Sequence, residues 1–306
     1  MAISAKDVME LRKQTDCGMM ECKKALTEAD GNFEKAIEIL RERGLATAAK
    51  KAGRIAAEGM VYADYCPECK VGVVIEVNAE TDFVAKNDKF VDFVKKATKV
   101  IMEQNPADVE TLMNCKMGDE TVDQALKELI LVIKENIKVR RFTRYEGVCS
   151  AYVHGGGTHG ILVNFETTNG IEAKDEFAAY GKDIAMQVAA ANPGYVDEAS
   201  VPAEVVAKEK EIMLAQMAGD PKTANKPEAV KQKMIEGKIK KFFKENCLVD
   251  QEFVKDGDLT VAQYTAKVAK DLGGDIKIVK FTRFQKGEGL EKRADDFAAE
   301  VASMVK

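Results

Sequence analysis

Two cysteines near the end of the first quarter of the chain have a spacing that could support chemistry. Cys66 and Cys69 are separated by two residues, as in many zinc sites and redox-active dithiols. Structural zinc needs four ligands, however, and the sequence contains no second pair with this spacing. A thioredoxin-type pair should open a helix, whereas Cys69 leads into an apolar strand. We therefore predict a proline-containing turn at residues 65–69, with a thiol or zinc enzyme as a rival interpretation.

Glycines and both histidines gather in a second stretch, residues 154–160. Gly155, Gly157 and Gly160 match the spacing of a dinucleotide-binding loop, but such a loop opens a helix and this one opens the apolar run at residues 161–165. His154 and His159 could supply two metal ligands, and a third is missing nearby. We interpret the stretch as a turn with surface histidines. The sequence predicts no catalytic residues, no cofactor and no bound metal.

The loop at residues 79–87 offers a different chemistry, a carboxylate beside a large aromatic ring at Asp82 and Phe83. Before the loop, apolar residues alternate over residues 71–77, which predicts a strand with one buried face. After it, apolar residues recur at helical spacing until Asn105-Pro106. Phe83 therefore either packs under its own helix or is offered to a binding partner.

The N-terminal 54 residues form the first predicted domain, with three short helices in residues 4–44. Ser4 and Asp7 fit a capping box for the first helix, and Gly44 suits the position that ends the third. Each helix has an apolar stripe, comprising Val8 and Leu11 in the first helix, Met19, Cys22 and Leu26 in the second, and Phe33, Ala36, Ile37 and Leu40 in the third. Met20 lies off these stripes.

The middle of the chain shows an internal repeat at a shift of 88 residues. Glu58-Gly59 then aligns with Glu146-Gly147, and both copies run through an apolar strand into a helix. We predict two α+β subdomains with antiparallel sheets, at residues 55–140 and 141–285. At the loop itself the first copy has Thr-Asp-Phe-Val, where the second has Asn-Gly-Ile-Glu. The second copy therefore lacks both the acid and the ring.

An inserted helical hairpin is predicted at residues 200–245, where charged helices carry too little apolar surface for a separate domain. Its narrow seam would consist of Val205, Ile212, Ile235, Ile239 and Phe242. Residues 276–283 echo residues 137–144, and we expect both segments to be strands, the later one pairing with the second subdomain. Residues 286–306 form a last module, with a helix whose apolar face contains Phe297, Val301 and Met304.

Composition narrows the class of protein. The chain has 306 residues, of which 46% are apolar and 32% charged, so it can bury a substantial core. A net charge of −5 without a basic block argues against direct nucleic-acid binding. No run of 18 apolar residues and no secretory signal occur, so we expect no membrane association. Seven cysteines without a regular framework predict reduced thiols and a cytoplasmic location.

Two strings in the expected order resemble one known family. Residues 81–87, Thr-Asp-Phe-Val-Ala-Lys-Asn, and residues 11–26 are similar to signatures of the translation elongation factor Ts family, the nucleotide exchange factors of elongation factor Tu. The resemblance extends over nearly all of the chain. It implies an α+β fold with an N-terminal three-helix domain similar to ubiquitin-associated domains, duplicated core subdomains, a coiled-coil insertion and a C-terminal helix that binds the partner.

The resemblance also implies which residues contact elongation factor Tu. Arg12, Met19 and Met20 would touch its GTPase domain, and His154 its third domain. Ile133 belongs to a helix end that flanks the aromatic loop, although Lys134 departs from the usual glycine there. The loop contacts would be Thr81, Asp82, Phe83 and Val84.

The function implied by the resemblance is guanine nucleotide exchange. The protein would bind elongation factor Tu in its GDP-bound and nucleotide-free states and promote release of GDP with loss of Mg²⁺, so that GTP can bind. A homodimer is possible. The rival from another class is a passive protein-binding module, similar to ubiquitin-associated domains, without exchange activity.

Overall fold

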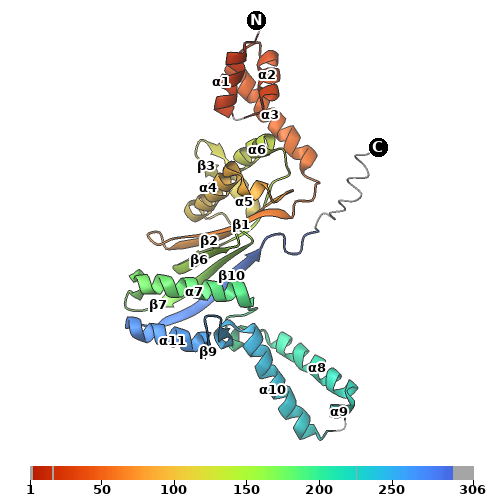
Figure 1. The fold of residues 1–306 in the computed structure, drawn as a ribbon, viewed down its shortest axis with the longest axis vertical. Helices are drawn as coiled ribbons and strands as arrows, with labels where there is room; N and C mark the ends of the chain where they lie inside the picture. The colour runs from red at the N-terminus through yellow and green to blue at the C-terminus, as the bar shows by residue number, and fades with distance from the viewer. Residues whose placement is uncertain (1–2, 16, 225, 292–306) are drawn as a thin grey trace.

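The computed structural model describes residues 3–15, 17–224 and 226–291. The molecule is elongated, with three helices at one end, two layered sheets in the middle and a helical arm at the other end (Figure 1). The structure is a mixed helix and sheet fold with antiparallel sheets, which confirms the predicted α+β class. The helix expected at residues 293–305 lies outside the described residues. Among the helices that are described, none is both long and apolar enough to cross a membrane.

The N-terminal domain contains the three expected helices, α1 (Ala5–Thr15), α2 (Met19–Glu28) and α3 (Phe33–Lys51). Ser4 and Asp7 exchange the two hydrogen bonds of a capping box, and the Asn32 side chain accepts from the Lys35 N–H to begin α3. The small core that these helices share is completed by Leu131, a residue of the neighbouring subdomain. The domain is therefore docked on the core.

Two details of this domain differ from the prediction. Gly44 does not end the third helix, which continues to Lys51. A Cβ at Gly44 would lie 3.3 Å from the carbonyl oxygen of Lys127, so the glycine allows α3 to approach its neighbour closely. Met19 was expected in the apolar stripe of the second helix, but it is exposed, and Ala25 is buried with Cys22 and Leu26 instead.

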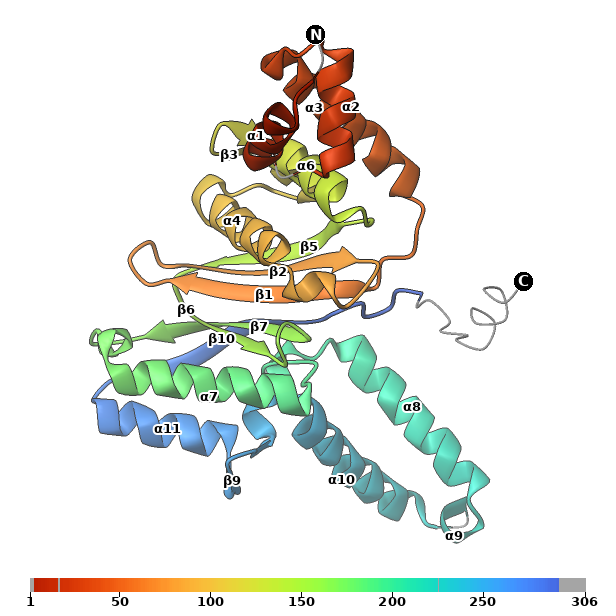
Figure 2. The ribbon, with the colours of Figure 1, turned by 45° about the horizontal axis from the view of Figure 1, so that its top comes forward.

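The first sheet has the strand order β1-β2-β5. Helices cover its outer face, as Figure 2 shows. The central strand was expected to bury one face, yet all nine of its residues are buried, because the second sheet covers the other face. The elements are β1 (Glu58–Cys66), β2 (Val71–Ala79), η1 (Val84–Lys86), α4 (Asp88–Gln104), α5 (Val109–Asn114), β3 (Lys116–Met117), β4 (Glu120–Thr121), α6 (Val122–Ile133) and β5 (Lys138–Glu146).

The second sheet repeats this plan with the strand order β10-β7-β6. The last strand pairs antiparallel with β7, which confirms the predicted return of the chain to the second subdomain. The elements are β6 (Val148–His154), β7 (His159–Thr167), η2 (Ile171–Ala173), α7 (Asp175–Ala191), η3 (Glu198–Ser200), η4 (Leu248–Asp250), β8 (Glu252–Phe253), β9 (Asp256–Thr260), α11 (Val261–Leu272) and β10 (Ile276–Gln285).

The two sheets pack face to face, with an apolar cluster from both sheets between them. Two glycines permit this approach. A Cβ at Gly72 would lie 2.6 Å from the Leu162 side chain, and one at Gly160 would lie 2.4 Å from the Val61 side chain. The expected boundary between residues 140 and 141 falls inside β5, a strand of the first sheet. The hydrogen-bonded unit of the first half therefore extends to Glu146.

The turn between β1 and β2 contains Cys66 and Cys69, as predicted. The expectation that all seven cysteines are reduced is wrong at this pair, which forms a disulfide. The turn places the two Cα atoms 5.5 Å apart, a separation that a disulfide readily spans. The other five cysteines are free thiols.

The helical arm leaves the second subdomain after α7 and projects away from both sheets (Figure 1). It consists of α8 (Ala203–Gly219), α9 (Pro221–Ala224) and α10 (Glu228–Asn246). Ile235 and Ile239 are buried in the seam as predicted, whereas Ile212 is exposed. The remaining seam residues are Val206, Met213, Met217, Met234 and Phe243, so the predicted positions Val205 and Phe242 are each off by one.

Candidate functional site

The loop between β2 and α4 exposes an aromatic ring. Phe83 is 78% exposed, and the neighbouring Asp82 is exposed as well. The interpretation in which this ring packs under its own helix is therefore wrong. The next residue, Val84, is buried in the first core and fixes the loop from beneath. Its side chain supports the loop and does not reach the surface.

Two glutamates brace this loop by reciprocal hydrogen bonds with the turn that follows α6. Glu135 accepts from the backbone N–H of Thr81 at 2.9 Å and from its hydroxyl at 2.7 Å. In the other direction, Glu80 accepts from the backbone N–H of Asn136 at 2.6 Å. Glu80 also pairs with Arg54 at 3.4 Å. Each segment thus supplies a carboxylate to the other, and bonds to charged acceptors are the stronger kind.

The same turn places Ile133 and Lys134 beside the loop. Ile133, the last residue of α6, is half-buried against the first core. Lys134 caps α6 in the left-handed conformation, with φ of 65°. Glycine adopts this conformation at little cost, whereas a lysine is held there by its surroundings.

His154 lies at the tip of the β6–β7 hairpin, and this tip is held against β1. The backbone N–H of Val61 donates to the carbonyl of Gly157 at 2.8 Å. The Tyr152 hydroxyl lies 2.9 Å from Nδ1 of His154, whose ring is exposed. Since β1 is paired along its length with β2, the hairpin tip and the Phe83 loop lie at neighbouring parts of the first sheet. The predicted turn at residues 154–160 is confirmed.

The second histidine of this hairpin is partly buried. Burial lowers the pKa of His159 below its ordinary value of 6.5, and the nearby charge of Arg283 lowers it further. The Nδ1 atom of His159 is buried without a hydrogen-bond partner. The centroids of the His154 and His159 rings are 6.3 Å apart. Within residues 3–15, 17–224 and 226–291, no three potential metal-ligating side chains of the His, Cys, Asp and Glu types converge.

Apart from Val84, whose side chain is buried beneath the loop, the predicted contact residues fall into two groups. We call the first group the loop edge, and it contains Thr81, Asp82, Phe83, Ile133 and His154. The second group, Arg12, Met19 and Met20, is exposed on α1 and α2 of the N-terminal domain. This domain is docked on α6, whose last turn leads into the loop edge, so α6 connects the two groups.

Sequence reasoning missed the polar residues that support the site. Glu80, Glu135 and Asn136 lie near the recognised loop or helix end, but their reciprocal bonds join positions more than 50 residues apart. Glu76 was visible as the one acid within a largely apolar strand. That pattern could have marked it as a buried charge with partners elsewhere.

An exposed aromatic ring on a braced loop, set on two packed antiparallel sheets, is typical of a surface that binds another protein. Comparisons with known proteins identify its family. The model of the family described as "Elongation factor TS" matches residues 80–288. Elongation factor Ts of Clostridium perfringens is 47% identical over 306 residues, covering 99% of each chain. Elongation factor Ts of Syntrophotalea carbinolica is 48% identical over 311 residues, covering 100% of each chain.

The chain therefore belongs to the elongation factor Ts family. This membership makes it a nucleotide exchange factor of elongation factor Tu in translation elongation. The passive binding module without exchange activity is not favoured.

Proposed function

We propose that the loop edge binds elongation factor Tu and that Phe83, with Asp82, inserts between helices near its nucleotide site. The observation that carries this proposal is the combination of exposure and support, an aromatic ring 78% exposed on a loop that Glu135 braces from the side. A GTPase holds Mg²⁺ against the nucleotide phosphates with oxygen ligands. A modest displacement of the supporting helices loosens metal and nucleotide together.

The energy available from this ring is sufficient for exchange. Burying a phenylalanine removes about 150 to 250 Å² from water, which gives at most ~4 to 6 kcal/mol. Since about 1.4 kcal/mol corresponds to a factor of ten, an acceleration of roughly a thousandfold is within reach. The coupling must be reciprocal, so bound nucleotide weakens the binding of this protein by the same factor. The protein accordingly binds both the GDP-bound and the nucleotide-free partner.

The N-terminal domain contributes binding and no chemistry to this scheme. We infer that its three helices form a ubiquitin-associated-like module, and its exposed residues Arg12, Met19 and Met20 face away from its core. Methionine side chains adapt to a partner surface. His154 adds a separate contact with the third domain of elongation factor Tu. Loss of Met20 is expected to weaken association more than the limiting exchange rate.

No covalent bond is made or broken in exchange, so the protein is not an enzyme and has no catalytic residues. It acts in the cytoplasm without direct nucleic-acid contact, and a homodimer is compatible with the scheme. The matching strand orders of the two halves reflect a duplication, in which only the first copy carries the exposed ring.

Release of labelled GDP from elongation factor Tu tests the role of Phe83. Replacement of Phe83 by alanine should lower the limiting release rate by about a hundredfold or more, because the ring supplies most of the buried area at the wedge. The matched control is Val254→Ala, which trims another exposed apolar side chain, 51% exposed and remote from the loop edge. The control should exchange nucleotide at the wild-type rate. Unchanged acceleration by Phe83→Ala would end the wedge proposal.

A further inference from the structure

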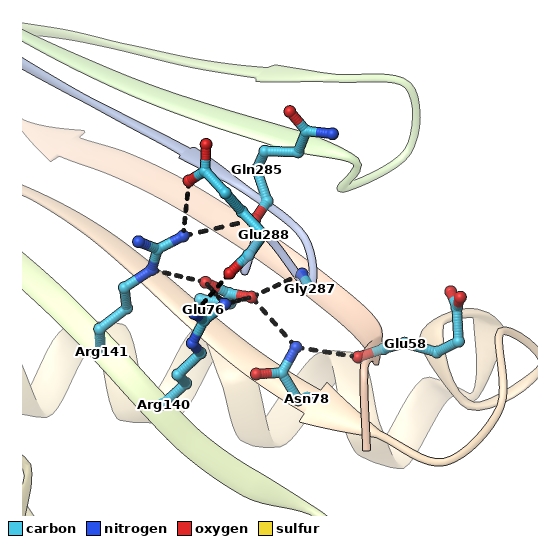
Figure 3. Close-up of polar contacts among 8 residues, drawn as sticks. All are labelled: Glu58, Glu76, Asn78, Arg140, Arg141, Gln285, Gly287 and Glu288. Carbon is cyan, nitrogen blue, oxygen red and sulfur yellow. Dashed lines mark hydrogen bonds and ion pairs between the residues drawn. The ribbon is translucent and has the colours of Figure 1, made fainter. Parts of the chain in front are cut away.

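A buried carboxylate lies in the interface between the two sheets. Glu76 is fully buried in the central strand β2, on the same face as Val74, which packs against the second sheet. Its oxygens accept hydrogen bonds from Arg140 at 3.0 Å, from Arg141 at 2.6 Å and from the Asn78 side chain at 3.1 Å. Figure 3 shows these side chains converging on the carboxylate.

A further bond to Glu76 comes from the other end of the chain. The backbone N–H of Gly287, two residues beyond β10, donates to the same carboxylate at 2.8 Å. The two arginines that bind Glu76 also bind this segment (Figure 3). Arg140 donates to the carbonyl of Glu288 at 2.6 Å, and Arg141 pairs with the Glu288 carboxylate at 3.2 Å. The cluster therefore binds backbone groups of residues 287 and 288 as well as side chains.

The same segment is held from three other sides. The guanidinium of Arg141 lies 4.2 Å from the centre of the Phe284 ring. Lys286 forms an ion pair with Glu58 at the start of β1, and its backbone N–H donates to the carbonyl of Thr158 at 2.9 Å. Gly287 has φ of 67°, and a Cβ there would lie 2.2 Å from the Ala57 carbonyl oxygen. Glycine at position 287 therefore allows the backbone of this segment to pass close to Ala57.

Stability alone does not account for this cluster. Replacing buried ion pairs by apolar side chains of similar volume is often neutral or stabilising, because desolvation offsets the attraction. What charged hydrogen bonds add is a fixed geometry, particularly with planar arginines. Here the geometry fixed is that of residues 284–288 relative to the first sheet.

The Glu76 cluster and the segment that it holds lie close to the loop edge. Glu76 lies four residues before Glu80, where the Phe83 loop begins. Leu290 and Glu291 line one cavity of about 270 Å³ together with Arg54, which itself pairs with Glu80. The chain thus leaves the core beside the loop edge. Thr158, which binds Lys286, belongs to the hairpin tip that carries His154.

We infer that Glu76, Arg140 and Arg141 are positioning residues for partner binding. They fix where and in which direction the chain leaves the second sheet, so that residues 286–291 approach the same partner face as Phe83. This inference rests on the proposed function, because the partner is the GTPase that the loop edge binds. The Glu76 cluster then determines how tightly the protein binds its partner, and Phe83 determines how fast GDP is released.

We call the contacts between the Glu76 cluster and residues 284–288 the clamp. Two variants of the full chain test the inference, each altering the clamp in a different way. Glu76→Gln removes the buried charge, and Gly287→Ala places a methyl group against Ala57 while leaving the charges intact. If the first variant does not fold, the second still decides. The matched control is Glu166→Gln, which removes an exposed ion pair with Lys277 on the second sheet.

The first measurement is amide hydrogen exchange of residues 286–291. Both clamp variants should lose protection there by about tenfold or more, the expected effect of losing a charge-assisted hydrogen bond. The second measurement is GDP release from elongation factor Tu as a function of exchange-factor concentration. Both variants should raise the half-saturating concentration by about tenfold and leave the limiting rate within about twofold of wild type.

The double variant Glu76→Gln/Gly287→Ala completes a mutant cycle. Since both residues act through one segment, the double variant should be no worse than the more affected single variant. Additive effects, an unchanged half-saturating concentration, or a limiting rate that falls as with Phe83→Ala would each overturn the inference. Failure of the wild-type protein to accelerate release would instead refute the proposed function. The two failures are therefore distinguishable.

Discussion

Phe83 is exposed, so its orientation depends on the residues around it more than on packing of its own ring. Val84 anchors the loop from below, and Thr81 ties it to Glu135 with two hydrogen bonds. An inserting side chain transmits force only if its base is rigid, because ordering a loop at the moment of binding costs free energy. The brace at Thr81 therefore belongs to the function as well as to the fold.

Replacement of Thr81 by valine tests this brace. Valine keeps the branched shape but removes the hydroxyl donor, leaving Glu135 with the backbone bond alone. The loss of one such bond costs about 1 kcal/mol, or roughly a fivefold reduction in the limiting rate of GDP release. The matched control is Thr167→Val, which removes a 2.9 Å bond to Glu172 beside the corresponding loop of the second half. Equal loss of exchange activity in both variants would contradict a specific role for Thr81.

At this scale, the sequence predicted the exposed residues better than their supports. The absence of an aromatic from the second copy suggested that Phe83 has a role beyond packing, and its exposure agrees. The partners of Thr81 and Glu76 could not be predicted, because the bonds connect strands and turns that are distant in the chain. Local patterns carry no information about such long-range contacts.

At the scale of single elements, the β6–β7 hairpin joins the loop edge to the second sheet. Its tip holds His159, whose Nδ1 is buried without a partner and whose pKa is lowered by burial. A histidine with a lowered pKa binds fewer protons in the folded state than in the unfolded state. The hairpin therefore makes the stability of the protein sensitive to acid.

The pH dependence follows from the sign of this shift. The unfolded chain takes up a proton at His159 near pH 6.5, whereas the folded chain does so only at lower pH. The free energy of unfolding should fall as pH decreases from about 6.5 towards the lowered pKa and be unaffected by this group above that window. Denaturant titrations from about pH 5 to pH 8 measure the slope. His159→Gln should flatten it, and an unchanged slope would exclude this histidine as the source.

Helices and strands were predicted well wherever the local signals were strong. Ser4 and Asp7 cap the first helix as expected, and the strand at residues 71–77 is present. The errors arose where tertiary contacts decide. Gly44 is a close-packing position inside a helix, and the arm seam uses Val206 where Val205 was expected, because the rotation of the helix is set by its partner helix across the seam.

At the scale of the whole molecule, two sheets of equal design pack through a shared face. This interface carries the Glu76 cluster at one end and the apolar contacts of Gly72 and Gly160 along its length. The two halves are therefore held at a fixed separation. Both the loop edge and the last described residues depend on that separation.

Substitution of Gly160 by alanine tests how tightly the sheets fit. The added methyl group would lie 2.4 Å from Val61 and 3.2 Å from Val74, so the sheets must shift apart. Overpacking of this kind costs roughly 1 to 3 kcal/mol of unfolding free energy. Equilibrium denaturation measures the loss, with Gly194→Ala as the control because its Cβ would meet nothing within 4 Å. Equal stabilities of the two variants would show that the interface can relax.

The strand order also determines when each sheet can form during synthesis. All strands of the first sheet lie between residues 58 and 146, so that half can assemble while the ribosome is still translating the rest. The second sheet must wait for β10, which ends at Gln285, after the whole arm has emerged. The β6–β7 hairpin can cover the first sheet early, but until β10 arrives the Glu76 carboxylate lacks its bond from Gly287. A nascent chain of this protein therefore passes through an interval in which early chaperone contact would be most useful.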